Sequence, residues 1–456
     1  MFEKIFHLKE NHTDVKTEVM AGITTFMTMA YILAVNPSIL SASGMDANAV
    51  LIATSLASFV GTALMALLAN YPFALAPGMG LNAYFAYTVV LTMGYSWQLA
   101  LMAVFVEGII FIVLSLTNVR EGIFNAIPMT LKSAVSVGIG RFVAFGGLQN
   151  AKLIVNSDST LVTYQHFKGE TFSSVGVGAI LALLGVAITA ILLVKKVKGG
   201  ILYGILITWV LGIVCELTGI YVPNPDAGMY SVIPTSFVSF DFSALGKTFG
   251  QVFKTDFSGV GILNFFAVMF SFLFVDLFDT LGTLIGVASK ADMLDEEGKL
   301  PRIKGALMAD SIATCAGAVL GTSTTTTFVE SASGVTEGGR TGLTSMTTGV
   351  LFLLAVVFSP LFLTIPSFAT APALIIVGFY MMGSALKIEF DDPAEGIPAF
   401  LTILAMPTAY SISEGIAIGV ISWTLLNVIT GKAKEKKISP LMYVLTVLFI
   451  LKYVLL

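Results

Sequence analysis

Long apolar runs follow one another along almost the entire chain. A helix of about 20 apolar residues is long enough to cross the hydrocarbon core of a bilayer. The runs occupy fourteen ranges: 18–36, 50–69, 78–90, 97–117, 130–148, 174–194, 200–219, 262–288, 304–320, 327–338, 341–358, 371–386, 397–409 and 411–430. They predict an all-α polytopic membrane protein with 14 transmembrane segments.

Composition supports this class. Of the 456 residues 56% are hydrophobic and 11% are charged, whereas soluble proteins have about 25% charged residues. This excludes an ordinary cytosolic enzyme, and the net charge of −4 includes no basic patch for a nucleic acid. Cys215 and Cys315 each lie in an apolar run, which excludes a disulfide framework or a thiolate metal site. No cofactor or metal is expected.

Lysine and arginine positions predict the orientation, because loops on the cytoplasmic side carry an excess of these residues. With the N-terminus inside, the inner segments contain most of them: Lys4, Lys9, Lys16, Arg120, Lys195, Lys196, Lys198, Lys290, Lys299, Arg302, Lys304, Arg340, Lys387, Lys432, Lys434, Lys436 and Lys437. The outer segments 149–173 and 220–258 hold few. Both termini are therefore expected in the cytoplasm, and 441–456, which contains Lys452, is expected as an inner-surface or shallow helix.

Three spans are interrupted at membrane depth. In the third, Pro72, Pro77, Gly78 and Gly80 predict that helix begins only near Asn82. In the tenth, the hydroxyl-rich run 322–327 favours extended backbone before a short helix. In the last interruption, 406–415 separates two apolar pieces that are expected to form a V. Extended backbone cannot face lipid, so these segments must be buried or line a cavity.

The first two interruptions occupy the third place in each set of seven spans. This spacing predicts inverted repeats, with a substrate pocket where the half-helices meet. The expected divisions are 1–219 for the first repeat, 220–254 for an extracytoplasmic connection, 255–430 for the second repeat and 431–456 for a cytoplasmic-side segment.

Two carboxylates lie in the apolar run from Ser271 to Thr283, SFLFVDLFDTLGT. Asp276 and Asp279 are spaced i, i+3, about 60° apart on one helix face, and each costs about 2.5–3.5 kcal/mol at the bilayer centre. We therefore expect a functional role. The alternative is a structural pair hydrogen-bonded to neighbouring threonines or backbone. For Glu107 a packing or helix-linking role is expected. For Glu414 capping and gating are equal alternatives.

Four motifs resemble the AzgA-like purine permeases of the nucleobase/ascorbate transporter family, which are related to the uracil permease. They are AGITTFMTMAYILAVNP at 21–37, PGMGLNAYF at 77–85, DLFDT at 276–280 and TTTTFVESASG at 324–334 followed by EGGRTG at 337–342. The resemblance covers nearly the whole chain. It implies seven plus seven inverted helices, with a core of spans 1–4 and 8–11, a gate of spans 5–7 and 12–14, and short strands in spans 3 and 10.

By motif, the resemblance places Asn82, Asp276, Asp279 and Glu330 at functional positions. Carboxylates can accept hydrogen bonds from the N–H groups of a purine, so Asp276 and Glu330 are expected to bracket the base, with Asn82 orienting it. Asp279 is expected to carry the proton of a symporter, with Asp276 as the alternative.

The three histidines, His7, His12 and His166, lie outside the spans. The uracil permease has a histidine one turn beyond its substrate carboxylate, so a proton relay here must use carboxylates.

The expected function is proton-coupled import of purine nucleobases, guanine and hypoxanthine first, by a cell-membrane protein that is not an enzyme. Relatives with this fold are often homodimers. An adenine-preferring permease is the alternative. A membrane-embedded Asp-dependent enzyme would need a second acidic cluster or a second catalytic aspartate motif. An anion exchanger would favour a basic residue at the site, but spans 3, 8 and 10 contain neither Lys nor Arg.

Overall fold

The computed structural model describes residues 2–116, 127–157, 159–165, 169, 171–197, 199–257, 260–290, 293–294 and 300–455. Within these ranges, ten helices are long and apolar enough to cross a membrane. The predicted all-α multi-pass class is confirmed, and the count of fourteen spans stays a prediction. Four residues named above, Arg120, His166, Lys198 and Lys299, lie outside the described residues.

The first half of the chain consists of long helices interrupted by a strand. Asp14 and Asp46 cap α2 and α4, because their carboxylates accept from the backbone N–H groups of Thr17 and Ala49. The elements are α1 Phe2–Phe6, α2 Val15–Met29, α3 Ile32–Ser41, α4 Ala47–Leu64, η1 Met65–Ala69, β1 Leu75–Pro77, α5 Met79–Ala83, η2 Tyr84–Thr92, α6 Trp97–Leu116, α8 Met129–Asn150, β2 Ile154–Ser157, β3 Leu161–Tyr164, η3 Phe172–Gly176, α9 Val177–Val194 and α10 Gly200–Leu217.

The second half repeats the pattern of long helices around one interrupted span. Short turns of 3₁₀-helix connect the halves. The elements are η4 Pro225–Ala227, η5 Ser243–Lys247, η6 Gln251–Lys254, α11 Ile262–Lys290, α12 Ile303–Leu320, β4 Thr325–Thr327, α13 Ser331–Thr336, α14 Gly342–Ala355, η7 Val356–Phe358, α15 Ser359–Leu363, α16 Ser367–Met381, η8 Met382–Lys387, α17 Pro393–Thr408, α18 Ile412–Ile429 and α19 Pro440–Leu455.

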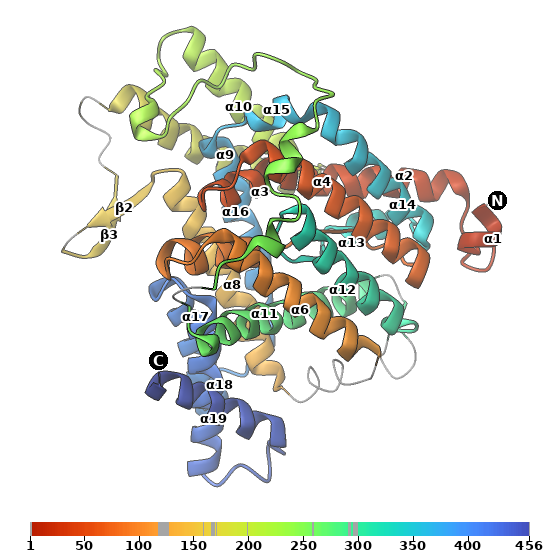
Figure 1. Ribbon diagram of the computed structural model, residues 1–456, viewed down its shortest axis with the longest axis vertical. Coiled ribbons are helices and arrows are strands. Elements are labelled where there is room, and N and C mark those ends of the chain that lie inside the picture. The colour runs from red at the N-terminus through yellow and green to blue at the C-terminus, as the bar shows by residue number, and fades with distance from the viewer. Residues whose placement is uncertain are drawn as a thin grey trace.

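The helices pack as a core and a gate. Helices α2, α4, α6, α11, α12 and α14 pack mainly on one another, and so do α8, α9, α10, α16, α17 and α18, whereas contacts between the two groups are fewer. In Figure 1 the gate helices follow one another down the left side and most core helices fill the right. This is the division that the resemblance implied. Helices α17 and α18 lie on either side of the last interruption and pack against each other, and the V shape expected of them stays a prediction.

A buried carboxylate joins two helices of the core, α2 and α14. Glu18 on α2 is fully buried and accepts hydrogen bonds at the start of α14, from the hydroxyl and backbone N–H of both Thr341 and Thr344. The backbone N–H of Arg340 adds another at 2.8 Å. Since the N–H groups at the start of a helix lack the i−4 carbonyl partners of its interior, the Glu18 carboxylate caps α14 and fixes it to α2.

The short strands of the two interrupted spans pair with each other. Strands β1 and β4 are antiparallel, with Leu75 opposite Thr327, Ala76 opposite Thr326 and Pro77 opposite Thr325. All six residues are buried. This confirms the predicted short strands in spans 3 and 10, and satisfies the extended backbone within the protein. A separate antiparallel hairpin joins β2 and β3.

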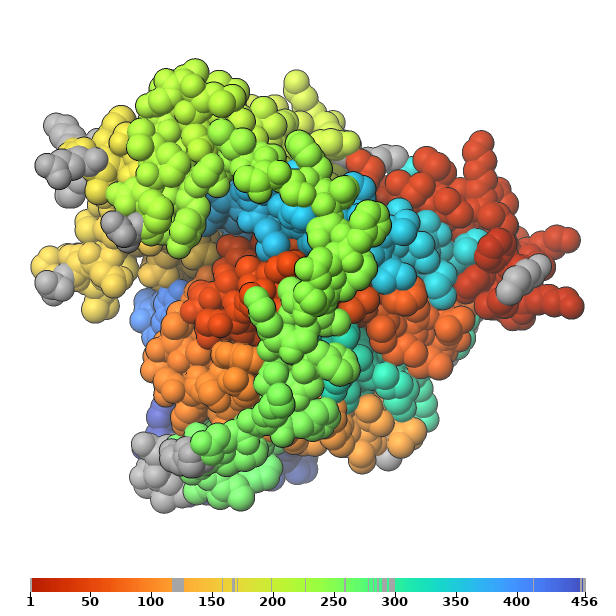
Figure 2. Space-filling view, turned by 45° about the horizontal axis from the view of Figure 1, so that its top comes forward, coloured from red at the N-terminus to blue at the C-terminus, as the bar shows by residue number. Residues whose placement is uncertain are grey.

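The segment between the halves crosses one face of the core. Figure 2 shows it in green, running over the red, orange and cyan parts of the chain. Lys247 pairs with Asp46 at 2.5 Å, Ser239 donates its N–H to Val357 O and Gly250 donates its N–H to Val319 O. The segment therefore follows the gate helix α10 along the chain and binds the core near the ends of α4, α12 and α14.

The C-terminal segment is attached to the gate. Lys432 and Lys436 pair with Asp392, the N-cap of α17, at 3.1 and 3.2 Å. The backbone N–H of Ala394 and these two ammonium groups lower the pKa of Asp392 to about 2. Helix α19 then packs against α18, and its Phe449 contacts Phe270 of α11. The final run is thus a helix, as expected, and its depth in the membrane stays a prediction.

The start of the helix in span 3 corrects an expectation. Helix α5 begins at Met79, three residues before Asn82. Pro77 ends β1, and the first helical hydrogen bond runs from Asn82 N to Gly78 O at 2.8 Å. Gly80 lies in the first turn of α5, where backbone N–H groups need no partner within the helix. Pro77 and Gly80 therefore do not prevent a helix from starting at Met79.

Candidate functional site

The candidate site lies where the two interrupted spans cross. Hydrogen bonds from Gly78 N to Thr324 O and from Phe328 N to Ala74 O extend the pairing beyond the strands. The crossing places the start of α5 next to the segment that leads into α13. Helix α11 packs against both β4 and α13, which brings its carboxylates to the same place.

One group at the crossing consists of two half-buried carboxylates and a fully buried tyrosine. Tyr31, between α2 and α3, donates its hydroxyl to Glu330 Oε1 at 2.7 Å. Asp279 Oδ2 lies 3.4 Å from the position that a Cβ would take on Gly78, at the start of α5. Asp279 and Glu330 are half-buried, and helix α11, which carries Asp279, packs against α13, which directly follows Glu330. Two carboxylates and one phenol therefore face a common region.

A second group is fully buried beside the first. The Thr280 hydroxyl lies 2.9 Å from Asp276 Oδ1, 2.9 Å from Asp310 Oδ1 and 2.6 Å from Thr326 Oγ1. All four side chains are at most 1% exposed. Asp276 is thus hydrogen-bonded to a threonine one turn along its own helix. This contact is the one expected if Asp276 has a structural role.

A third group ties span 3 to span 10. Ser323 donates its hydroxyl to Asn82 Oδ1, and Thr324 donates its hydroxyl to Glu107 Oε2 at 3.1 Å. Asn82 and Glu107 are fully buried. In this structure Asn82 contacts the neighbouring span, and Glu107 on α6 has a packing contact of the kind expected for it.

The structure thus brings Asn82, Asp276, Asp279 and Glu330 to one crossing, in three separate environments. Asp279 and Glu330 share one of them. Tyr31, Thr280 and Asp310 belong to the same region and were not predicted. Asp310 did have a sequence signal, because it is an acidic residue within the apolar run 304–320.

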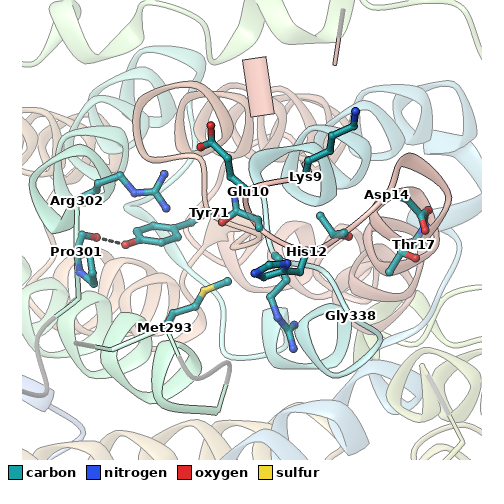
Figure 3. Close-up of a pocket in the computed structure, with 13 residues that line it drawn as sticks. Lys9, Glu10, His12, Asp14, Thr17, Tyr71, Met293, Pro301, Arg302 and Gly338 are labelled. Atoms are coloured by element: carbon teal, nitrogen blue, oxygen red, sulfur yellow. Dashed lines mark hydrogen bonds between the residues drawn. The ribbon is translucent and has the colours of Figure 1, made fainter. Parts of the chain in front are cut away.

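A cavity of about 990 Å³ opens at the N-terminal end of the core. Figure 3 shows Tyr71, Met293 and Arg302 on one side of it and Asp14 and Thr17 on the other. The guanidinium of Arg302 lies 4.8 Å from the centre of the Tyr71 ring. None of the four predicted site residues lines this cavity. It adjoins the segments that precede β1 and follow α13, and it therefore lies at the ends of both interrupted spans that are next to the N-terminal segment.

The sequence profile of the Permease family matches residues 16–418. The chain belongs to this family. The permease is 46% identical to the guanine/hypoxanthine permease PbuG of Bacillus subtilis over 98% of each chain. It is 42% identical to the adenine permease AdeP of Escherichia coli, over 100% of its own length and 96% of that protein. The resemblance to nucleobase permeases is confirmed.

The permease also shares its fold with a solved transporter. The transmembrane domain of the cyanobacterial bicarbonate transporter BicA superposes with a TM-score of 0.63 at 16% identity, over 89% of the permease and 97% of that domain. This similarity concerns the fold alone. Family membership places the permease among multi-pass membrane transporters.

Proposed function

We propose that this permease imports purine nucleobases together with protons across the cytoplasmic membrane by alternating access, with guanine and hypoxanthine as preferred substrates. The names of PbuG and AdeP both point to purines, and the slightly greater identity to PbuG favours the 6-oxopurines. Preference for adenine is the second candidate. Separate core and gate groups support movement of one against the other.

The partly exposed pair of carboxylates is the observation that carries this proposal. Guanine and hypoxanthine present an N1–H donor beside a 6-oxo acceptor, and a carboxylate accepts from N–H groups. Asp279 and Glu330 are proposed to receive the base, with the Tyr31 hydroxyl holding Glu330 in position. Asp276 is fully buried, so we propose that it handles the proton, which exchanges the roles first expected for the two aspartates. Asn82 is proposed to position the crossing around the base.

Uptake of labelled hypoxanthine, guanine and adenine in cells that lack their own purine permeases tests the substrate. We expect saturable uptake of hypoxanthine and guanine, and weak competition by adenine. Stronger uptake of adenine would select the second candidate, and absence of all three activities from a well-expressed protein would contradict purine transport.

Coupling to protons follows from the charge balance. A neutral purine gains nothing from the membrane potential, whereas one proton moving with it gains about 2.3 kcal/mol per 100 mV, enough for about fiftyfold accumulation. In proteoliposomes, a protonophore should abolish accumulation. Accumulation that persists after the proton gradient collapses, or that follows an imposed Na⁺ gradient, would contradict this coupling.

We further propose that both termini face the cytoplasm, that 220–254 lies outside, and that 1–219 and 255–430 are the inverted repeats. In a variant without Cys215 and Cys315, a single cysteine at Ser239 should react with an impermeant reagent on intact cells. One at Lys434 should react only after the cells are opened. The reverse pattern would overturn the orientation.

A further inference from the structure

The Thr280 hydroxyl has more hydrogen-bond partners than it has hydrogens. It contacts Asp276 Oδ1, Asp310 Oδ1 and Thr326 Oγ1, all within 2.9 Å. A hydroxyl supplies one hydrogen and two lone pairs. It can therefore donate to one carboxylate only, and the other carboxyl must bring its own proton for its contact to be a hydrogen bond.

Burial prevents solvent from resolving this conflict. Asp276, Thr280 and Asp310 are 0% exposed, and two carboxylates so close together in an apolar medium cannot both be ionised. The charged groups on the elements packed against α11 and α12 are Glu107 on α6, Lys132 and Arg141 on α8, Lys254 on η6, Glu330 before α13 and Glu414 on α18, together with Asp279 and Lys290 on α11 and Lys304 on α12.

We propose that Asp310 shares one proton with Asp276 through Thr280, and that this pair is the proton site of the symporter. The inference rests on the proposed proton-coupled transport and adds Asp310 of α12 to it. Asp310 does not contact the purine in this proposal. It holds the shared proton in position and affects the purine only through other groups.

The bridge has two states that differ by one proton. With the proton bound, one carboxyl donates to Thr280, Thr280 donates to the other carboxylate, and Thr326 donates to Thr280. After the proton leaves to water, two carboxylates compete for the single hydrogen of Thr280 and repel each other. Since Thr326 lies in β4 opposite Ala76 of β1, the protonation state acts directly on the crossing beside Asp279 and Gly78.

The test compares two assays on purified protein in liposomes. Exchange of internal for external labelled hypoxanthine needs no net proton movement, whereas accumulation driven by an imposed pH gradient does. Asp310→Asn mimics a permanently protonated acid. It should keep exchange within twofold of the unaltered protein, lose at least tenfold of gradient-driven accumulation, and show exchange that no longer varies with pH between 5 and 8.

Asp46→Asn is the matched control, because it removes a carboxylate that pairs with Lys247 at the surface, and both assays should be unchanged. Thr280→Ser keeps the bridging hydroxyl and should behave as the unaltered protein, whereas Thr280→Val should behave as Asp310→Asn. If Asp310→Asn does not fold, the comparison of Thr280→Ser with Thr280→Val tests the shared proton instead.

Gradient-driven accumulation by Asp310→Asn or Thr280→Val at the unaltered level would overturn the shared proton. Loss of exchange together with accumulation in both variants would also overturn it, in favour of a purely structural role. If the unaltered protein itself exchanges hypoxanthine but ignores the pH gradient, the proposed coupling fails and not the assignment of Asp310 alone.

Discussion

Glu330→Gln is expected to reduce hypoxanthine uptake at least tenfold at unchanged expression. The carboxylate lies half-buried at the crossing of the interrupted spans and accepts a hydrogen bond from Tyr31. A hydrogen bond between a purine N–H and a charged group contributes about 1.5–3 kcal/mol, and 1.4 kcal/mol corresponds to a tenfold change in affinity. The amide has nearly the same shape and is cheaper to bury, so the protein should still fold. Initial rates and binding of labelled hypoxanthine measure the loss.

Glu337→Gln supplies the matched control. It makes the same chemical change at the other end of α13, where the side chain is exposed, and uptake should stay within twofold. Asp279→Asn should reproduce the loss seen for Glu330→Gln, since the two carboxylates occupy one region. Normal uptake by either site variant would remove that residue from the substrate site.

The interruptions in the helices were predictable because they depend on local chemistry. Pro77 removes a donor from the backbone, and the threonines at 322–327 favour extended structure. The family resemblance implied the short strands, whereas these local constraints act within a few residues, so the positions of both interruptions followed from the sequence. The start of α5 did not, because proline and glycine are tolerated where a helix has unpaired N–H groups, and only the three-dimensional path of the chain shows that Met79 is such a place.

The division of labour between the carboxylates could not be predicted. Asp276 and Asp279 differ by about 60° around one helix, and the sequence does not say which other elements those directions meet. Asp276 faces Asp310, which follows it by 34 positions in the sequence and lies on another helix. Asp279 faces the start of α5, which comes from the other half of the chain. Burial of one and partial exposure of the other result from tertiary packing alone.

Gly78→Ala is expected to reduce uptake at least tenfold. Gly78 has φ −71° and ψ 126°, a conformation open to any residue, so the effect is steric. A Cβ there would lie 2.8 Å from Thr326 Cγ2, closer than real Cβ contacts, and 3.4 Å from Asp279 Oδ2. Overpacking of a tight interior costs about 1–3 kcal/mol, and here β1 and β4 must separate or Thr326 must turn. Either movement displaces the start of α5 from Asp279.

The neighbour that causes the clash can be removed without losing its hydroxyl. Thr326→Ser deletes Cγ2 and keeps the oxygen that contacts Thr280, so the double variant should recover most of the uptake that Gly78→Ala loses. Gly246→Ala makes the same addition where a Cβ would meet nothing within 4 Å, and it should have no effect. Full activity of Gly78→Ala would show that the crossing is looser than these contacts require. Failure of Thr326→Ser to rescue a folded Gly78→Ala protein would instead shift the cause to Asp279, the other side chain close to the new methyl group.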